Sequence, residues 1–139
     1  ILRSNVVFSF QERTKASFMD WVVDSLENRQ SITVVDDQWN NPTWTVDLAR
    51  IISRIIDHEI QGLYHYGGRD LLNRFAFAEM IAETFKLDRT LIEPIDTASL
   101  NQLAKRPLKS GLRPEKIEID LSVEALPLRK ALDEIYSLS

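Results

Sequence analysis

Apolar stretches alternate with polar breaks along the chain, and their spacing predicts alternating strands and helices. Residues 1–10 are β-branched, aromatic and almost continuously apolar, a pattern typical of a strand buried on both faces of a parallel sheet. Shorter runs at residues 31–35, 62–66 and 91–95 predict three further strands. We expect Gly67 and Gly68 to form the turn that follows residues 62–66.

Apolar residues three and four positions apart predict helices between these strands. The first helix is expected over residues 15–28, and the second is capped by Thr43 or Thr45 and ends near His58. The third begins at Asn73 and runs to residue 85, a short helix follows over residues 96–104, and the last begins at Pro127. Strands that alternate with helices in this way predict an α/β architecture.

Length and composition are those of one ordinary domain. The chain has 139 residues, of which 44% are hydrophobic and 27% charged. The net charge of −4 offers no broad electrostatic attraction to nucleic acid or to an anionic membrane, so we expect neither as a partner. No apolar run approaches the length of a membrane span. The absence of cysteine excludes disulfides and thiolate chemistry and agrees with a reducing, cytoplasmic location.

Common catalytic signatures are missing from the chain. Its four glycines do not form the G-x-G-x-x-G loop that holds dinucleotides. None of the three tyrosines is followed four residues later by lysine. The two histidines, His58 and His65, have no further feature that indicates a metal site, so no metal is expected. The chain itself therefore carries no recognisable catalytic centre.

The polar residues after the strand at 31–35 have two interpretations. Asp36 and Asp37 occupy the position where α/β sheets often place active groups. The alternative is that they form a solvated turn that caps or borders the next helix. Spacing alone favours the solvated turn.

A basic cluster lies in a chain that is otherwise acidic, and it too has two interpretations. Its members are Lys105, Arg106, Lys109, Arg113 and Lys116. An arginine offers a planar fork that matches phosphate, and Pro107 would hold Arg106 on rigid, non-helical backbone. The cluster is either a clamp for a diphosphate or a solvated basic loop, and spacing does not decide between them.

Several short motifs resemble one family in order along the chain. The segment Asp37-Gln38-x-x-Asn41-Pro42-Thr43, with Leu48-Ala49 after it, resembles the D-Q-x-x-x-P-T…L-A pattern of dTDP-4-dehydrorhamnose reductases, which belong to the extended short-chain dehydrogenase class. Similar matches to the family's remaining segments occur at residues 1–4, 62–68, 77–82 and 104–116. The resemblance therefore covers essentially the whole chain.

The resemblance implies that the chain is the C-terminal portion of a Rossmann-type protein. Two sheet strands, residues 1–8 and 63–66, would accompany a small substrate-binding lobe. Residues 1–139 would form a substrate-binding domain fragment without the Rossmann half, which carries the family's glycine-rich loop and Tyr-x-x-x-Lys pair. The first residues already read as the inside of a strand, so we expect the missing N-terminal Rossmann half to be a partner of this chain.

The function implied by the resemblance is substrate binding in an NAD(P)-dependent reductase of 4-keto nucleotide sugars. The chain would be inactive on its own and would not bind NAD(P) tightly. The residues implied for the substrate are Gln38, Asn41, Thr43, Arg106 and Lys105, and those bordering the nicotinamide end of the cofactor are Ser4 and Asn5. Val6 replaces a tryptophan that contacts the sugar in the rhamnose reductases, so the resemblance does not identify the nucleotide sugar.

The same sequence features are compatible with other functions. Catalytically inactive relatives suggest a binding or regulatory module, and other members of the class suggest a piece of a nucleotide-sugar epimerase or dehydratase. Strands with open edges also pair readily with another chain. An interaction module or a homo-oligomer is therefore a further expectation.

Overall fold

The computed structural model describes residues 1–10, 17–100 and 104–139. Its helices are α1 (Phe18–Glu27), α2 (Thr45–Asp57), α3 (Arg74–Thr84), α4 (Glu115–Leu121) and α5 (Leu128–Leu138). Its strands are β1 (Leu2–Arg3), β2 (Val7–Phe8), β3 (Ile32–Val35), β4 (Trp39–Asn40), β5 (Thr43–Trp44), β6 (Tyr64–His65), β7 (Leu72–Asn73) and β8 (Ile92–Ile95). The 3₁₀ segments are η1 (Arg89–Leu91) and η2 (Thr97–Leu100). The α/β class predicted from the sequence is confirmed.

Parts of two predicted helices, residues 15–16 and 101–103, lie outside the described residues. No helix in the described ranges combines the length and the apolar character needed to cross a membrane.

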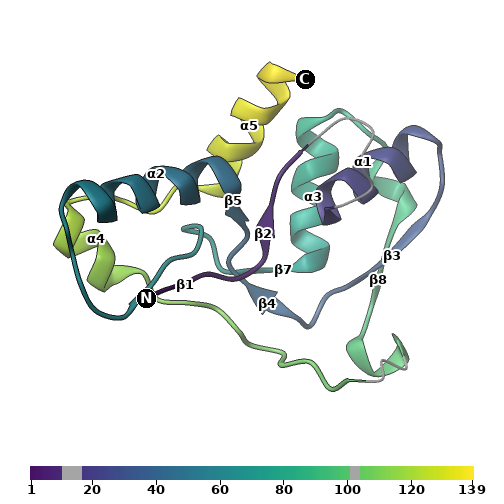
Figure 1. Ribbon diagram of the computed structural model, residues 1–139. Helices are drawn as coiled ribbons and strands as arrows, with labels where there is room; N and C mark the ends of the chain where they lie inside the picture. The colour runs from purple at the N-terminus through teal and green to yellow at the C-terminus, as the bar shows by residue number, and fades with distance from the viewer. Residues whose placement is uncertain (11–16, 101–103) are drawn as a thin grey trace.

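The strands pair two by two and connect distant parts of the chain. The longest ladder is parallel and joins β3 to β8, with Ile32 opposite Ile92 and Val35 opposite Ile95. β1 pairs in parallel with β6, β2 in parallel with β5, and β4 antiparallel with β7. Figure 1 shows these shorter pairs in the middle of the molecule, between α2 and α4 at one end and α1, α3, β3 and β8 at the other.

The first ten residues form two short strands instead of the single strand predicted for residues 1–8. Val6 separates them with a φ of 42°, a left-handed conformation that is strained for a β-branched residue. After this kink the chain leaves β6 and pairs with β5. Ile1 and Val7 are 86% and 47% exposed, so the described residues do not by themselves cover both faces of this segment.

Two separate groups of buried apolar side chains stabilise the two ends of the molecule. The larger lies between α1, α3, α5 and the β3–β8 ladder, and includes Phe77 and Leu132. The smaller lies between α2, α4 and β6, and includes Tyr66 and Ile117. Burying one large apolar side chain contributes about 1.5–3 kcal/mol. The two cores leave polar strand ends and loops between them.

Side-chain caps begin two of the helices. Ser17 and Asp20 form a capping box at α1, in which each side chain accepts a hydrogen bond from the other residue's backbone amide. Asn73 caps α3 as predicted, because its Oδ1 accepts a bond of 2.7 Å from the amide of Ala76. The last helix, α5, begins directly after Pro127, also as predicted.

α2 begins without a side-chain cap, so the prediction that Thr43 or Thr45 caps it is wrong. Its N-cap residue is Trp44, which makes no capping hydrogen bond. The predicted end at His58 is confirmed. α2 is instead positioned by Ile51, which is buried in the smaller core.

α4 is a helix that the sequence patterns did not predict. It begins after Pro114 and includes Lys116, a member of the basic cluster. Ile117 and Leu121 lie one helical turn apart and are both buried in the smaller core. A single apolar pair is too short a repeat to distinguish a helix from a loop in sequence alone.

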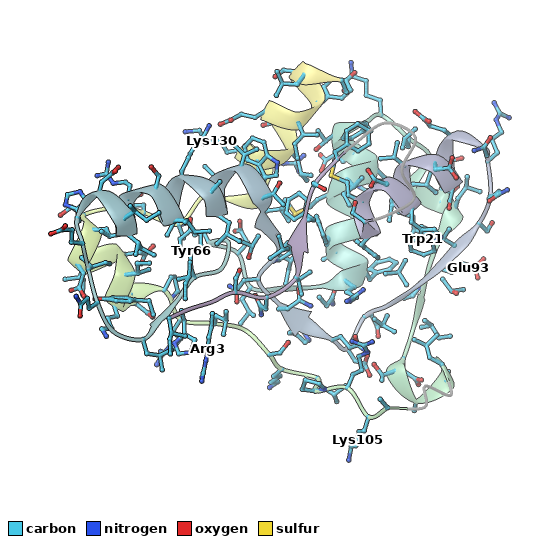
Figure 2. The ribbon with its side chains drawn as sticks, in the orientation of Figure 1. Arg3, Trp21, Tyr66, Glu93, Lys105 and Lys130 are labelled. Atoms are coloured by element: carbon cyan, nitrogen blue, oxygen red, sulfur yellow. The ribbon has the colours of Figure 1, made fainter. Side chains whose placement is uncertain are left out.

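A buried hydrogen bond joins the start of α2 to the segment after β6, and Figure 2 shows Tyr66 alongside α2. The hydroxyl of Tyr66 donates to the carboxylate of Asp47, and both residues are buried. Burial raises the pKa of Asp47, although the bond from Tyr66 and the charge of Arg50 oppose the rise. A raised pKa favours folding below the pKa of the unfolded chain, and this contribution is lost as the pH rises through the folded-state pKa.

We expect Tyr66→Phe to lower the free energy of unfolding by about 1–3 kcal/mol at neutral pH, because Asp47 loses its donor in a buried place. The loss should shrink as the pH falls through the folded-state pKa of Asp47, since a protonated carboxyl group needs the donor less. Urea unfolding at neutral pH and at about pH 4 measures both effects.

Tyr64→Phe is the matched control for this experiment. The hydroxyl of Tyr64 donates to Asp120 over 2.8 Å at the edge of the molecule, so its removal should cost less. Equal losses in the two variants, or a loss from Tyr66→Phe that does not change with pH, would contradict the role given to the buried pair.

Candidate functional site

The segment predicted to bind substrate is tied to η2. The carboxylate of Asp37 accepts hydrogen bonds from the backbone amide of Thr97, at 3.1 Å, and from its hydroxyl, at 2.5 Å. Nε2 of Gln38, a buried residue, donates to the same hydroxyl oxygen over 2.9 Å. Asp37 therefore caps η2, and it does not cap the helix that follows it in sequence.

Asn41 connects three segments through its amide group. Its Nδ2 donates to the carbonyl oxygen of Gly68 over 3.0 Å, and its Oδ1 accepts a bond of 2.7 Å from the amide of Leu112. The side chain is 4% exposed. Both polar atoms of Asn41 are thus engaged within the chain.

Thr43 is fully buried and holds the same region together. Its hydroxyl lies 3.0 Å from the carbonyl oxygens of Asn5 and Asn41, to either of which it can donate its one proton. The same oxygen accepts a bond of 3.3 Å from the amide of Gly68. Asn41 and Thr43 therefore maintain the shape of the loop that carries Gln38.

The two glycines after β6 allow a close crossing of two backbone segments, and the structure has no turn at Gly67 and Gly68 where one was predicted. A Cβ atom at Gly68 would lie 2.1 Å from the carbonyl oxygen of Pro42, and one at Gly67 would lie 2.8 Å from Cβ of Asn41. Neither position has room for a side chain, which explains the glycines.

We expect Gly68→Ala to lower the free energy of unfolding by about 1–3 kcal/mol or more, because the added methyl group meets backbone that cannot move aside. Gly111→Ala is the matched control, since its Cβ would meet the flexible end of the exposed Leu71 side chain, at 2.5 Å, and would approach Oδ1 of Asn41 only to 3.2 Å. Thermal and urea unfolding of both variants compare the two losses. A loss at Gly111 as large as that at Gly68 would show that the crossing is not the tight constraint described.

The basic segment after residue 104 runs beside this loop. The amide of Trp39 donates to the carbonyl oxygen of Leu108 over 2.7 Å, and the amide of Ser110 donates to the carbonyl oxygen of Trp39 over 2.9 Å. Nδ2 of Asn5 donates to the carbonyl oxygen of Ser110 over 2.6 Å. These bonds bring the segment that contains Arg106 next to the loop that contains Gln38.

Gln38 and Arg106 line one cleft of about 310 Å³ between β3, α1 and the basic segment. This volume lies at the lower end of the range for small-molecule sites, ~300–1,000 Å³. The aromatic side chains of Phe18 and Trp21 contribute to another wall. Arg106 is exposed. Lys105 is also exposed, does not line the cleft, and points away from the body of the molecule in Figure 2.

Arg74, the first residue of α3, also lines this cleft, and the sequence patterns did not single it out. Its guanidinium carbon lies 5.5 Å from the centroid of the Phe18 ring. Burial lowers the pKa of Arg74, and the charge of Arg106 adds to the effect. One feature of the sequence could have indicated it. A cation in the first turn of a helix is disfavoured by the helix dipole, so its presence suggests a role other than stabilising the helix.

Three other hollows fit an anion less well. One is lined by Glu115, Glu118 and Glu124 with a single arginine, and would repel a phosphate. Another has neutral side chains around Trp44, and a third mixes acidic and basic groups around Arg50. The described residues also include no group of three or more His, Asp and Glu side chains placed to hold a metal.

Ser4 and Asn5, predicted to border the cofactor, lie between β1 and β2 and do not line the cleft. Oγ of Ser4 and Oδ1 of Asn5 are buried without a hydrogen-bond partner. Buried polar atoms are nearly always paired in folded proteins, so these two neighbouring atoms could each accept a hydrogen bond that the described residues do not supply.

Comparisons with known proteins identify the family of the chain. The model of the RmlD substrate binding domain matches residues 1–138, so the chain belongs to that family. It is the substrate-binding part of a dTDP-4-dehydrorhamnose reductase-like protein of the extended short-chain dehydrogenase class, which confirms the resemblance inferred from its motifs.

Two relatives illustrate the range of the similarity. Methionine adenosyltransferase 2 subunit beta of Danio rerio is 25% identical over 139 residues, covering 95% of this chain and 43% of that protein. The dTDP-4-dehydrorhamnose reductase of Aggregatibacter actinomycetemcomitans is 28% identical over 130 residues, covering 86% of this chain and 44% of that protein. The chain thus spans less than half the length of these relatives.

Solved structures have the same fold. A dTDP-4-dehydrorhamnose reductase of Clostridium acetobutylicum superimposes with a TM-score of 0.88 at 26% identity, covering 99% of this chain and 47% of that one. The enzyme of Bacillus anthracis, solved in complex with NADP, has a TM-score of 0.87 at 21% identity and matches in fold.

Proposed function

We propose that this chain binds the nucleotide-sugar substrate of an NAD(P)-dependent reductase that acts on a 4-keto sugar in cytoplasmic carbohydrate biosynthesis. One observation carries the proposal: Gln38 and Arg106, far apart in sequence, line the same cleft. Because the chain has no Tyr-x-x-x-Lys pair and no glycine-rich loop, proton and hydride transfer belong to a separate Rossmann half. The chain is inactive without that half.

The cleft has the chemistry that a nucleoside diphosphate needs. Arg106 presents a planar guanidinium that matches phosphate oxygens, and it takes part in none of the ion pairs within the described ranges. Phe18 and Trp21 offer aromatic surface to a base. The amide of Gln38, held by Thr97, adds a hydrogen-bonding group.

The other predicted substrate residues act less directly. Asn41 and Thr43 hold the loop in the shape that places Gln38 in the cleft, through the bonds to Gly68 and Leu112. Lys105 does not line the cleft, but as an exposed cation next to Arg106 in sequence it attracts an anionic ligand over a longer range. Their substitution should therefore affect stability or association rate more than specific recognition.

Ser4 and Asn5 fit a place beside the nicotinamide end of NAD(P). Their unpaired oxygen atoms, Oγ and Oδ1, could accept hydrogen bonds from a carboxamide such as that of nicotinamide. NAD(P), when bound to the Rossmann half, supplies the hydride. Ser4 and Asn5 hold the nicotinamide end but offer too few contacts to bind the cofactor tightly without that half.

We expect Arg106→Gln to weaken binding of dTDP by about tenfold to a hundredfold, because hydrogen bonds to charged groups contribute about 1.5–3 kcal/mol. Isothermal titration calorimetry at fixed ionic strength measures the dissociation constant. The stability of the fold should hardly change, since the side chain is exposed.

Arg113→Gln is the matched control, because it removes the same charge from a side chain that is 91% exposed and paired with Glu115 at 3.6 Å. Its dTDP affinity should stay close to that of the unsubstituted chain. If the unsubstituted chain does not bind dTDP, or if Arg106→Gln and Arg113→Gln behave alike, the proposed function is wrong.

A regulatory, non-catalytic role is a second candidate, favoured by the similarity to methionine adenosyltransferase 2 subunit beta over 95% of the chain. The reading frame that encodes this chain discriminates the reductase role from the regulatory role. A Rossmann half with a glycine-rich loop and Tyr-x-x-x-Lys, together with reduction of a 4-keto nucleotide sugar by the full-length protein, supports the reductase. A cofactor half without the Tyr-x-x-x-Lys pair supports the regulatory role.

A further inference from the structure

The cleft contains a second guanidinium group that the described residues do not neutralise. Arg74 lines it together with Arg106, and neither arginine takes part in the ion pairs found within the described ranges. Nε of Arg74 is buried and has no hydrogen-bond partner. A buried charged donor left unpaired is costly, so this atom requires an explanation.

The position of Arg74 is held by packing. Its guanidinium carbon lies 5.5 Å from the centroid of the Phe18 ring, a distance typical of a cation–π contact. The neighbouring charge of Arg106 lowers the pKa of Arg74 further than burial alone. Two like charges at one cleft repel each other, and an anion between them adds an attraction to each that offsets the repulsion.

Packing alone does not explain this arrangement. A side chain retained only for its contact with Phe18 could place its Nε–H in water or against a carbonyl group. Arg74 instead keeps a buried, unpaired donor in the wall of the cleft that contains the second arginine. A ligand with several acceptor oxygens close together satisfies both guanidinium groups, each of which has five N–H donors.

We propose that Arg74 and Arg106 bind one diphosphate group from two sides, Arg74 from the wall of the cleft and Arg106 from its exposed rim. The proposal rests on the proposed function and specifies its ligand: the cleft prefers a nucleoside diphosphate to the monophosphate because two phosphate groups offer oxygen atoms to both arginines. Arg74 is thus a residue that determines specificity, in addition to packing on Phe18.

Calorimetric titration of the 139-residue chain with dTDP, dTMP and thymidine tests this directly. The variants are Arg74→Gln, Arg74→Lys and Arg106→Gln, each checked by circular dichroism and thermal unfolding. Arg50→Gln is the matched control, since Arg50 also lies over an aromatic ring, 5.8 Å from the centroid of Trp44, but outside this cleft.

We expect Arg74→Gln to weaken dTDP binding by about tenfold or more and to remove most of the preference for dTDP over dTMP, with thymidine binding unchanged. Arg74→Lys keeps the charge without the fork, so its dTDP affinity should be intermediate. Both variants should also show a weaker dependence of dTDP affinity on salt. Arg50→Gln should bind all three ligands normally.

The possible outcomes separate this inference from the proposed function. If the unsubstituted chain does not bind dTDP, both are wrong. If Arg106→Gln weakens binding but Arg74→Gln and Arg74→Lys leave the ratio of dTDP to dTMP affinity unchanged, only the role of Arg74 is wrong, whatever the variants do to stability. If Arg74→Gln does not fold, an Arg74→Lys variant that binds dTDP as tightly as the unsubstituted chain overturns the inference by itself.

Discussion

The close crossing of two backbone segments determines where the functional side chains lie. Asn41 and Pro42 pass over Gly67 and Gly68 so closely that a Cβ at Gly68 would lie 2.1 Å from the carbonyl oxygen of Pro42. The amide of Asn41 then connects the crossing to Leu112, over 2.7 Å. Because the loop with Gln38 and the segment with Arg106 are both attached here, their meeting in one cleft follows from this contact.

In this arrangement, the residues that maintain the shape of the loop are different from those that line the cleft for a ligand. Asn41 and Thr43 are buried, and their polar atoms bond within the chain. Gln38, Arg74 and Arg106 line a cleft whose positive charge has no paired carboxylate in the described ranges. A neutral interior can be maintained by such hydrogen bonds alone, whereas two neighbouring arginines repel each other and are stabilised by a bound anion.

Features that depend on neighbouring residues were predictable from the sequence, and features that depend on distant contacts were not. The cap at Asn73 and the start of the last helix at Pro127 follow from local chemistry and are confirmed. The glycine pair was assigned to a turn because its close approach to Pro42 involves a segment far away in sequence. Thr43 was expected to cap α2, but its hydroxyl lies within hydrogen-bonding distance of the carbonyl oxygen of Asn5, which is distant in sequence. Motif order identified the family, while Arg74 became visible only when the fold placed it beside Arg106.

A crystal structure of the protein with dTDP bound tests the central claim most directly. The two phosphate groups should lie between the guanidinium groups of Arg74 and Arg106, with the base toward Phe18 and Trp21. Nε of Arg74, unpaired in the structure described above, should then donate to a phosphate oxygen. A nucleotide bound elsewhere on the chain, or phosphates that contact neither arginine, would contradict the account.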